Sequence, residues 1–198
     1  MLADSRLSRN MVLRKTIHLS GFLVPLIFVP VFNVYLVSAA LFLLCVVYAA
    51  SEAARIRGFD FPVLSVVTRR AAKSVLEMNG FATAPVTFAL GIAFSLLVFP
   101  APIAYVSIAV LTLGDGCACV FGVILGKTPL FHNRSKTVEG SICGFVCAFL
   151  GSILFVDPVY ALVAVGVGML VESIPFSFED NLLVPLSSGI TLMFLSFL

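Results

Sequence analysis

Apolar runs of about 20 residues recur along almost the whole of this chain, and they limit its possible folds more than any other feature. Lipid offers no hydrogen-bond partner to backbone N–H and C=O groups, so such a run must satisfy these groups internally, as a helix does. Hydrophobic residues make up 61% of the chain and charged residues 11%, whereas a soluble domain is about half apolar and about a quarter charged. The sequence therefore predicts an all-α integral membrane protein.

We expect a polytopic helix bundle of about seven transmembrane helices. It should form a single membrane domain over residues 1–198, with no separate soluble domain. The expected spans are about 16–32, 34–52, 81–99, 103–126, 138–156, 158–174 and 182–198. Turn-forming residues separate them at Pro30/Asn33, Pro100/Pro102 and Asp157/Pro158. We do not expect the first run to be a cleaved signal peptide, because more spans follow it and it lacks a convincing small-residue cleavage site.

The positions of the basic residues agree with this topology. If the N-terminus is cytoplasmic and seven spans alternate, all twelve Lys and Arg residues fall on the cytoplasmic side, as the positive-inside rule requires. The other side then receives only tight turns, with Asp157 as its single charge. We therefore expect a multi-pass protein with its N-terminus and active site at the cytoplasmic face. Such a basic face suits anionic lipid headgroups or a nucleotide substrate, and we expect no nucleic-acid partner.

The segment between the second and third spans, residues 52–80, is too polar to cross a membrane and too apolar for a plain loop. From about Pro62 onward, its valine and alanine residues can form one face of a helix, while Arg69, Arg70 and Lys73 lie toward the other. We interpret this part as an amphipathic helix in the membrane interface. A cytoplasmic helix packed on the bundle is the alternative.

The stretch GDGCACVFGVILGKT, residues 114–128, ends like a phosphate-binding loop but does not fit that pattern. A P-loop has four residues between its first Gly and its GK[ST] element, whereas only three separate Gly122 from Gly126. The stretch also continues an apolar helix instead of following a short strand. Its small residues Gly114, Ala118, Gly122 and Gly126 recur at a spacing of four. Such a row lets a second helix backbone approach closely in a membrane.

Asp115 lies in the same stretch, and helix packing does not explain it. A carboxylate inside a span costs about 2.5–3.5 kcal/mol on insertion scales, which makes it a candidate functional residue. It needs a cation, from a metal or from the loop HNRSKTVEGS at 132–141. That loop carries Lys136 and Glu139, and Gly140 follows at a predicted helix N-terminus that favours anions. Cations, carboxylates and free N–H groups together indicate a nucleotide-phosphate site with Mg²⁺. A solvated turn is the alternative, and it explains the loop but not Asp115.

Motifs along nearly the whole chain resemble those of the CTP-dependent lipid-alcohol kinases, the family of dolichol kinase, phytol kinase and fungal-type diacylglycerol kinase. The similar segments are RKTIH at 14–18, SEAARIRG at 51–58, EMNGFATAPVTFALG at 77–91, GDGCACVFGVILGK at 114–127, SKTVEGS at 135–141 and EDNLLVPL at 179–186. CDP-diacylglycerol synthases share the GD and KTxEG elements, so those two alone indicate only a membrane enzyme that uses CTP. The RKxxH and DNxxxP elements favour the kinases.

The resemblance implies transfer of a phosphoryl group from CTP to the hydroxyl group of a membrane lipid alcohol, with Mg²⁺ or Ca²⁺ as cofactor. It assigns three sets of residues to this chemistry. The implied catalytic residues are Asp115, Lys136 and Glu139, and the implied metal ligands are Asp115, Glu139 and Asp180. The implied contacts to nucleotide or phosphate are Arg14, Lys15, His18, Gly122, Lys127, Thr137, Gly140 and Asn181. Glu52 and Glu77 are further candidates for a second carboxylate.

Two other functions stay open on the sequence. A phosphatidate cytidylyltransferase would consume CTP and release pyrophosphate, but the chain is short for one and its N-terminal motif is of the kinase type. A non-enzymatic transporter or lipid-binding protein would use Asp115 as a coupling-ion or proton site, but the charges cluster on one face instead of lining a path through the membrane. The apolar spans do not distinguish among polyprenol, phytol and diacylglycerol as acceptors.

Overall fold

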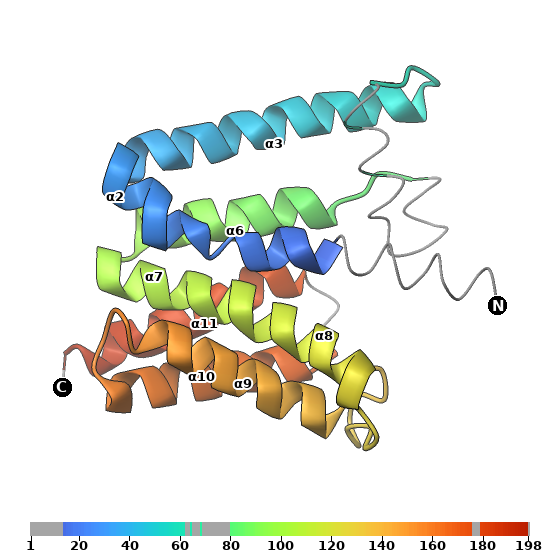
Figure 1. Cartoon of the computed structure of the whole chain (residues 1–198). Coiled ribbons are helices and arrows are strands. Elements are labelled where there is room, and N and C mark those ends of the chain that lie inside the picture. The colour runs from blue at the N-terminus through green and yellow to red at the C-terminus, as the bar shows by residue number, and fades with distance from the viewer. Residues whose placement is uncertain (1–13, 62–63, 65–67, 69–79, 176–178, 198) are drawn as a thin grey trace.

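The computed structural model describes residues 14–61, 64, 68, 80–175 and 179–197. This part of the chain folds into a bundle of apolar helices (Figure 1). Within it, extended pairing is limited to one isolated antiparallel bridge between Pro129 and Thr137. The expected all-α membrane helix bundle is therefore confirmed.

The helices lie at the positions of the seven predicted spans. Three are long and apolar enough to cross a membrane: Arg14–Phe32, Val34–Ile56 (α3) and Ala101–Leu125. The shorter apolar helices have 15 or 16 residues and are Ala84–Val98 (α6), Val138–Ser152 (α9), Pro158–Ser173 (α10) and Asp180–Leu195 (α11). The clearest differences in length are in α3, which continues four residues beyond the expected end of its span, and in α9, which stops four residues before it.

Two of the long helices contain a π-helical turn, in which one extra residue enters the helix. The first helix includes η1 (Val24–Phe28) and α2 (Val29–Phe32). The helix Ala101–Leu125 consists of α7 (Ala101–Ala109), η2 (Val110–Gly114) and α8 (Asp115–Leu125). π-turns often occur at functional sites, and Asp115 directly follows η2.

Local side-chain chemistry explains where the helices are interrupted. Asn33 adopts a φ of 73°, a left-handed conformation that Asn tolerates, and its Oδ1 accepts the N–H of Leu36 at 3.0 Å to cap α3. Asp157 caps α10 in the same way through the N–H of Val159 at 2.9 Å. Pro100 takes the N-cap position of α7. The three predicted breaks are confirmed.

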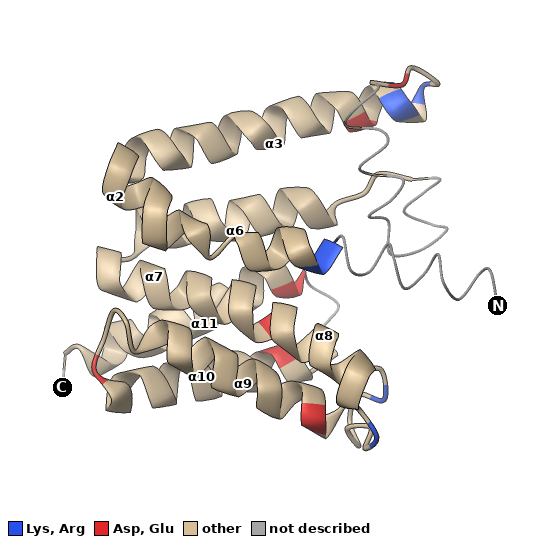
Figure 2. Ribbon diagram, in the orientation of Figure 1, with Lys and Arg blue, Asp and Glu red and all other residues tan. Residues whose placement is uncertain are grey.

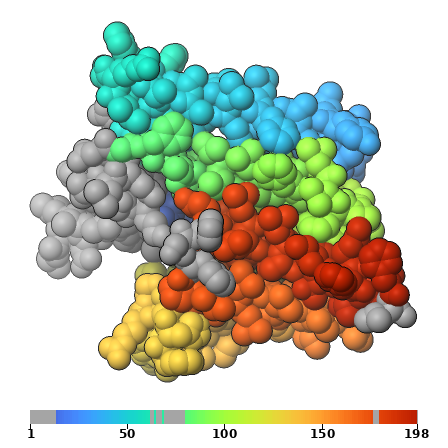
Figure 3. Space-filling view, turned by 180° about the vertical axis from the view of Figure 1, so that it is seen from behind, coloured from blue at the N-terminus to red at the C-terminus, as the bar shows by residue number. Residues whose placement is uncertain are grey.

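The helix Ala101–Leu125 lies at the centre of the bundle. Its middle is fully buried, with Ala104, Val106, Ile108 and Val110 at 0% exposure. α6, α9, α10 and α11 pack around it. Seen from behind, α11 lies between α10 and the pair α6 and α7 (Figure 3). α3 lies at the edge of the bundle, where it packs mainly on α6 and exposes apolar side chains of the kind that face lipid.

Charged residues gather at one end of the bundle, as the sequence predicted (Figure 2). The described Lys and Arg residues all lie at this end, which we call the charged end. Asp157 lies at the opposite end, because it is in the turn between the end of α9 and the start of α10. The charged end is therefore where the described residues can bind a polar substrate.

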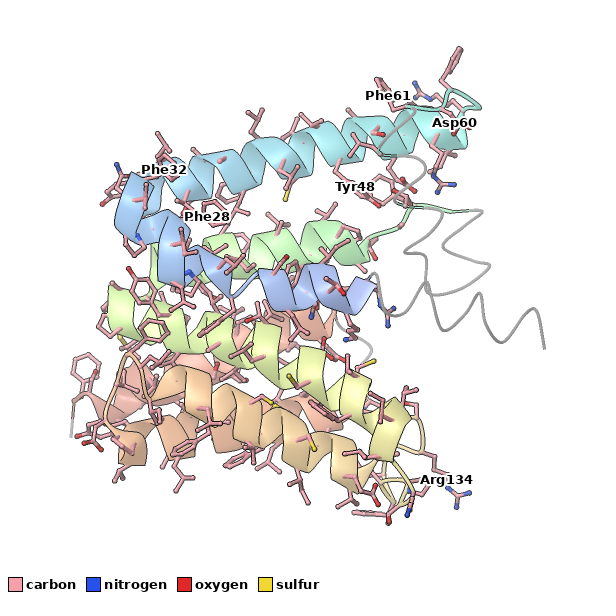
Figure 4. All side chains as sticks on the ribbon, viewed as in Figure 1. Phe28, Phe32, Tyr48, Asp60, Phe61 and Arg134 are labelled. Carbon is pink, nitrogen blue, oxygen red and sulfur yellow. The ribbon has the colours of Figure 1, made fainter. Side chains whose placement is uncertain are left out.

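The predicted amphipathic helix after Pro62 lies outside the described residues except for Leu64 and Thr68. Both of these are helical. The hydroxyl of Thr68 donates to the hydroxyl of Tyr48 on α3 at 3.2 Å (Tyr48 is labelled in Figure 4). This contact connects the segment to α3, and its amphipathic character stays a prediction.

The row of small residues in α8 lets α9 approach closely, as predicted. A Cβ atom added at Gly140 would lie 2.5 Å from the carbonyl oxygen of Ala118 and 2.7 Å from Cα of Gly122. A Cβ added at Gly144 would lie 2.5 Å from the carbonyl oxygen of Gly114. Only glycine fits at these positions, because a side chain would push the two backbones apart.

Replacing Gly144 with Ala should therefore destabilise the bundle. The new methyl group would overlap the carbonyl oxygen of Gly114, directly before α8, and the methyl group of Ala118 in α8. Overpacking of this kind costs about 1–3 kcal/mol. A lower melting temperature of the purified protein in detergent is the expected result. Gly166 in α10 supplies a matched control, since a Cβ there meets nothing within 4 Å. Gly166→Ala should leave the melting temperature unchanged or raise it slightly, and equal effects of the two changes would contradict the close packing of α8 and α9.

Candidate active site

Asp115 lies at the charged end, where the first helix crosses the start of α8. Its Oδ2 is 2.8 Å from Nζ of Lys15 and 3.1 Å from Nδ1 of His18, both on the first helix. The Lys15 side chain is 7% exposed and that of Asp115 is 21% exposed. A Cβ added at Gly116 would lie 2.7 Å from the side chain of Leu19, so a glycine brings the two helices together here. The cation that the sequence analysis required for Asp115 is thus supplied by a lysine 100 residues earlier.

His18 connects Asp115 to the start of α11. Its Nε2 is 3.2 Å from Oδ1 of Asn181, and its ring stacks on Phe88 of α6 with the centroids 4.1 Å apart. The amide nitrogen of Asn181 donates to the carbonyl oxygen of Ala84 at 3.2 Å and to the hydroxyl of Thr87 at 3.1 Å. Asn181 therefore uses both ends of its amide in contacts with protein.

A second set of charges lies at the ends of α10 and α11. Nζ of Lys136 is 2.7 Å from Oε1 of Glu172 and 3.7 Å from Oδ2 of Asp180, and it also donates to the backbone carbonyl of Glu172. Glu172 is almost completely buried, with 2% of its surface exposed, whereas the side chain of Asp180 is 43% exposed. Asp115 and Asp180 are close enough to Glu172 to interact with it electrostatically. The two sets form one group, which we call the charged cluster: Lys15, His18, Asp115, Lys136, Glu172 and Asp180.

The loop between α8 and α9 is held together by its own hydrogen bonds and places Lys136 in this cluster. The N–H of Leu130 donates to the carbonyl of Lys136 at 2.9 Å, and that of Val138 donates to the carbonyl of Thr128 at 2.9 Å. Glu139 closes the base of the loop, because its carboxylate accepts the N–H groups of Lys127 and Thr128 at 3.1 Å. The Thr128 hydroxyl adds a third donor to Glu139 at 2.9 Å.

The tip of this loop docks on the end of α10. The amide of Asn133 donates to the carbonyl of Ser173 at 3.0 Å, and Nε2 of His132 lies 3.2 Å from the Ser173 hydroxyl. These contacts fix the loop beside Glu172. Lys136 turns inward to the cluster, whereas Arg134 projects from the loop away from the bundle (Figure 4).

The remaining sequence-predicted residues lie around the cluster and not in it. Gly122 and Gly140 face each other where α8 and α9 cross. Thr137 caps α9 by accepting the N–H of Gly140 at 3.2 Å. Lys127 is exposed at the base of the loop, and Arg14 is half-buried beside Lys15.

Of the two further carboxylate candidates, Glu77 lies outside the described residues. Glu52 is 1% exposed and belongs to a different contact. It pairs with Arg55 and accepts the N–H of Ala82 at 3.2 Å, while Arg55 donates to the carbonyl of Gly80 at 2.6 Å. This pair joins the end of α3 to the start of α6.

Sequence reasoning missed Glu172. The signal was present, because Glu172 is a carboxylate within an apolar run, and the insertion cost that singled out Asp115 applies to it equally. Glu139, in contrast, was expected beside Asp115, but its carboxylate holds the loop. Glu172 takes the place near Asp115 that the sequence analysis gave to Glu139.

The residues of the cluster fit a divalent cation that arrives together with phosphate. Among the described residues, no group of three or more His, Cys, Asp or Glu side chains is placed to hold a metal ion by itself. Mg²⁺ commonly binds through one or two carboxylates and completes its shell with phosphate oxygens and water. Glu172 offers an oxygen for this purpose, because its Oε2 is buried and makes no hydrogen bond within the described part of the chain.

Replacing Lys15 with Met should destabilise the protein strongly. The change leaves the Asp115 carboxylate without its lysine partner, and breaking a buried ion pair costs about 3–5 kcal/mol. The double variant Lys15→Met/Asp115→Leu removes both charges and should recover most of the loss. Melting temperatures in detergent measure both effects. A double variant as unstable as the single one would show that Lys15 stabilises the fold by some route other than the pair.

Comparison with known proteins finds plant phytol kinases. A probable phytol kinase 2, chloroplastic, of Glycine max is 33% identical over 124 residues, which cover 52% of this chain and 42% of the relative. The probable phytol kinase, chloroplastic, of Zea mays is 33% identical over 124 residues, or 52% and 41% of the two chains. Phytol kinase 1, chloroplastic, of Arabidopsis thaliana is 30% identical over 135 residues, or 57% and 43%.

The chain thus spans less than half the length of the curated relatives that it matches. No family model and no solved structure matches it significantly. The similarity to several phytol kinases over about half of the chain confirms the resemblance to the lipid-alcohol kinase family.

Proposed function

We propose that this protein is a membrane-embedded kinase that transfers a phosphoryl group from CTP to the hydroxyl group of a lipid alcohol. The observation that carries the proposal is the charged cluster, in which carboxylates and lysines from the first helix, α8, α10, α11 and one loop meet at one end of an apolar bundle. The similarity to phytol kinases supports the phosphorylation of a lipid alcohol.

The charge balance of the cluster supports a metal–nucleotide complex as ligand. Asp115, Glu172 and Asp180 contribute three carboxylates, whereas Lys15 and Lys136 contribute two ammonium groups. With His18 neutral, this leaves one negative charge in excess, which attracts a divalent cation, and the cation can in turn bind the phosphate oxygens of the nucleotide. Mg²⁺, or Ca²⁺ in its place, would bind through one or two of these carboxylates together with phosphate oxygens, and it would neutralise charge on the phosphates.

In this reaction the hydroxyl oxygen bonds to the terminal phosphorus of CTP while the bond to the bridging oxygen breaks and CDP leaves. The released hydroxyl proton passes to a carboxylate. Glu139 was the sequence candidate for this task or for the metal, but it holds the loop, so we assign the proton to the carboxylates of the cluster. Lys15 and Lys136, with Arg14 and Lys127 beside them, would neutralise phosphates. Positioning and charge neutralisation are the main demands of phosphoryl transfer.

Thr137, Gly122 and Gly140 would act through the backbone. The cap at Thr137 and the close crossing of Gly122 with Gly140 fix the N-terminus of α9 beside the loop that carries Lys136. A helix N-terminus attracts anions, so this place suits a phosphate of the nucleotide.

We further propose that the seven helices cross the membrane in alternation, with the N-terminus and the charged end at the cytoplasmic face. The segregation of Lys and Arg at one end supports this orientation. A helix of 15 or 16 residues is about 22–24 Å long, somewhat less than the hydrocarbon thickness of about 30 Å. Flanking residues and local thinning of the bilayer would accommodate the difference.

The acceptor would be a lipid alcohol that enters sideways from the bilayer. The names of the relatives make phytol the first acceptor to test, with a polyprenol such as dolichol and diacylglycerol as the others.

The test is an assay of purified protein in liposomes with γ-labelled CTP, Mg²⁺ and each lipid alcohol in turn. We expect label in a lipid phosphate. Asp115→Asn should reduce the rate at least about 100-fold, because loss of one transition-state charge contact has effects of this size.

Asp157→Asn is the matched control for this assay. Asp157 lies at the opposite end and caps α10, a role that Asn fulfils equally well. Its activity should equal that of the wild type. Labelled pyrophosphate released in the presence of phosphatidic acid would mean a cytidylyltransferase instead. An equal loss of activity in the two variants would show that Asp115 has no specific part in the reaction.

The proposed topology predicts that a reagent outside intact cells labels a cysteine at one end of the bundle and not at the other. In a cysteine-free background, a cysteine in place of Tyr35, which is 77% exposed at the end opposite the charged end, should react with a membrane-impermeant maleimide. A cysteine in place of Arg134 should react only in inverted vesicles or after permeabilisation. Reaction of both positions from outside would contradict the cytoplasmic orientation.

A further inference from the structure

The tip of the loop between α8 and α9 exposes an aromatic ring close to a cation. Phe131 is 94% exposed, a larger fraction than for any other large apolar side chain in the described part of the chain. Arg134, three residues later, projects away from the bundle (Figure 4), and Lys127 is exposed at the base of the loop. Water is an unfavourable environment for a phenylalanine ring. The tip therefore fits a partner that offers apolar and anionic groups together.

Contacts with α10 fix the direction of the Phe131 ring. The side chains of His132 and Asn133 contact Ser173 at the end of α10. The ring of Phe131 lies edge-on to that of His132, with the centroids 4.9 Å apart. The ring of Phe131 is thus held by a neighbour that is itself docked, and its exposure is a property of the folded loop.

The same contacts place the tip at the level of a membrane surface. Ser173 is the last residue of α10, so the tip lies level with the helix ends. In the last turn of α8, Val123 and Ile124 are 63% and 67% exposed, as expected for side chains that face hydrocarbon. The exposed Lys127 follows soon after, and such a change from apolar to basic side chains is typical of the border between hydrocarbon and headgroups. Phe131 therefore continues the lipid-facing surface of α8 into the headgroup region.

The end of α3 shows the same combination of side chains. Gly58 has a φ of 88°, and the N–H of Phe59 returns to the carbonyl oxygen of Ala54 at 3.0 Å, which ends the helix in a Schellman motif. Phe59 is 73% exposed, and Arg57 beside it is also exposed. The end of α3 and the α8–α9 loop lie at opposite edges of the charged end in both views (Figures 1 and 3). A membrane surface meets both edges at once, whereas a protein partner usually binds one contiguous patch.

We propose that Phe131 and Arg134 form a site for an anionic phospholipid at the membrane surface of the charged end. The ring of Phe131 inserts beside the upper part of the acyl chains. The guanidinium of Arg134 pairs with phosphate oxygens of the headgroup, for which its planar donors are well suited, and Lys127 adds positive charge. Charge complementarity and the continuity of Phe131 with the lipid-facing end of α8 select a lipid as the occupant. The site does not depend on the proposed kinase reaction.

The depth of the tip can be measured by fluorescence, because the chain contains no Trp. Phe131→Trp introduces a single fluorophore into the full-length protein in liposomes of phosphatidylcholine and phosphatidylglycerol. We expect lipids brominated near the headgroup to quench it more than lipids brominated near the chain ends. Leu44→Trp, at a 53% exposed position near the middle of α3, is the control and should show the opposite order. Quenching of Phe131→Trp by aqueous iodide and not by brominated lipid would overturn the proposal. Protection from both quenchers would indicate a contact between proteins and would overturn it as well.

The preference for anionic lipid requires a second measurement on the Phe131→Trp protein. Spin-labelled phosphatidylglycerol and phosphatidylcholine are compared as quenchers at equal mole fraction. Phosphatidylglycerol should be enriched about fivefold around the fluorophore, as expected for one arginine near an anionic headgroup. Adding Arg134→Gln should remove most of this preference, whereas Arg57→Gln, a matched change at the opposite edge, should preserve it. Equal quenching by the two lipids, or an equal loss of preference in the two variants, would overturn the proposal.

Discussion

Every charge that this chain places among apolar helices needs a partner, and this requirement organises the charged end of the bundle. Asp115 on the central helix is neutralised by Lys15 on the first helix, and Glu172 on α10 is neutralised by Lys136 from a loop. Because an unpaired charge at such a depth costs several kcal/mol, the helices cannot slide past one another without losing a pair. The same pairs that hold the helices in register bring the charges of five separate segments together in one group.

The helices could be predicted from the sequence because their limits are encoded locally. Asn33, Pro100 and Asp157 end or begin helices by their own side-chain chemistry, and each acts within three residues of itself. The close contact of α8 and α9 was also predictable, since small residues at a spacing of four lie on one helix face whatever the partner is. The length of α3 was not, because Glu52 and Arg55 look like the polar end of a helix until their buried partners at Gly80 and Ala82 are known.

The residues of the site were easier to predict from the sequence than the ion pairs that they form. Asp115 and Lys136 stood out from an apolar background, but their partners lie 100 and 36 residues away, a separation at which sequence spacing carries no geometric information. Glu139 and Glu172 show the consequence. Both are carboxylates near a helix end, and only the path of the loop determines that Glu139 binds backbone N–H groups while Glu172 lies beside Lys136.

The π-turn η2 has a consequence for the direction in which Asp115 faces. An α-helix advances about 100° per residue, so the one residue that a π-turn adds rotates everything after it by about that angle relative to everything before it. The central helix can therefore present one side to α6 and α11 through α7, and a different side to α9 through α8. Without this rotation, a straight helix that packed in the core in the same way would not direct the Asp115 carboxylate toward Lys15. The π-turn therefore sets a constant rotation between α7 and α8, and with it one helix both packs in the core and directs Asp115 toward Lys15.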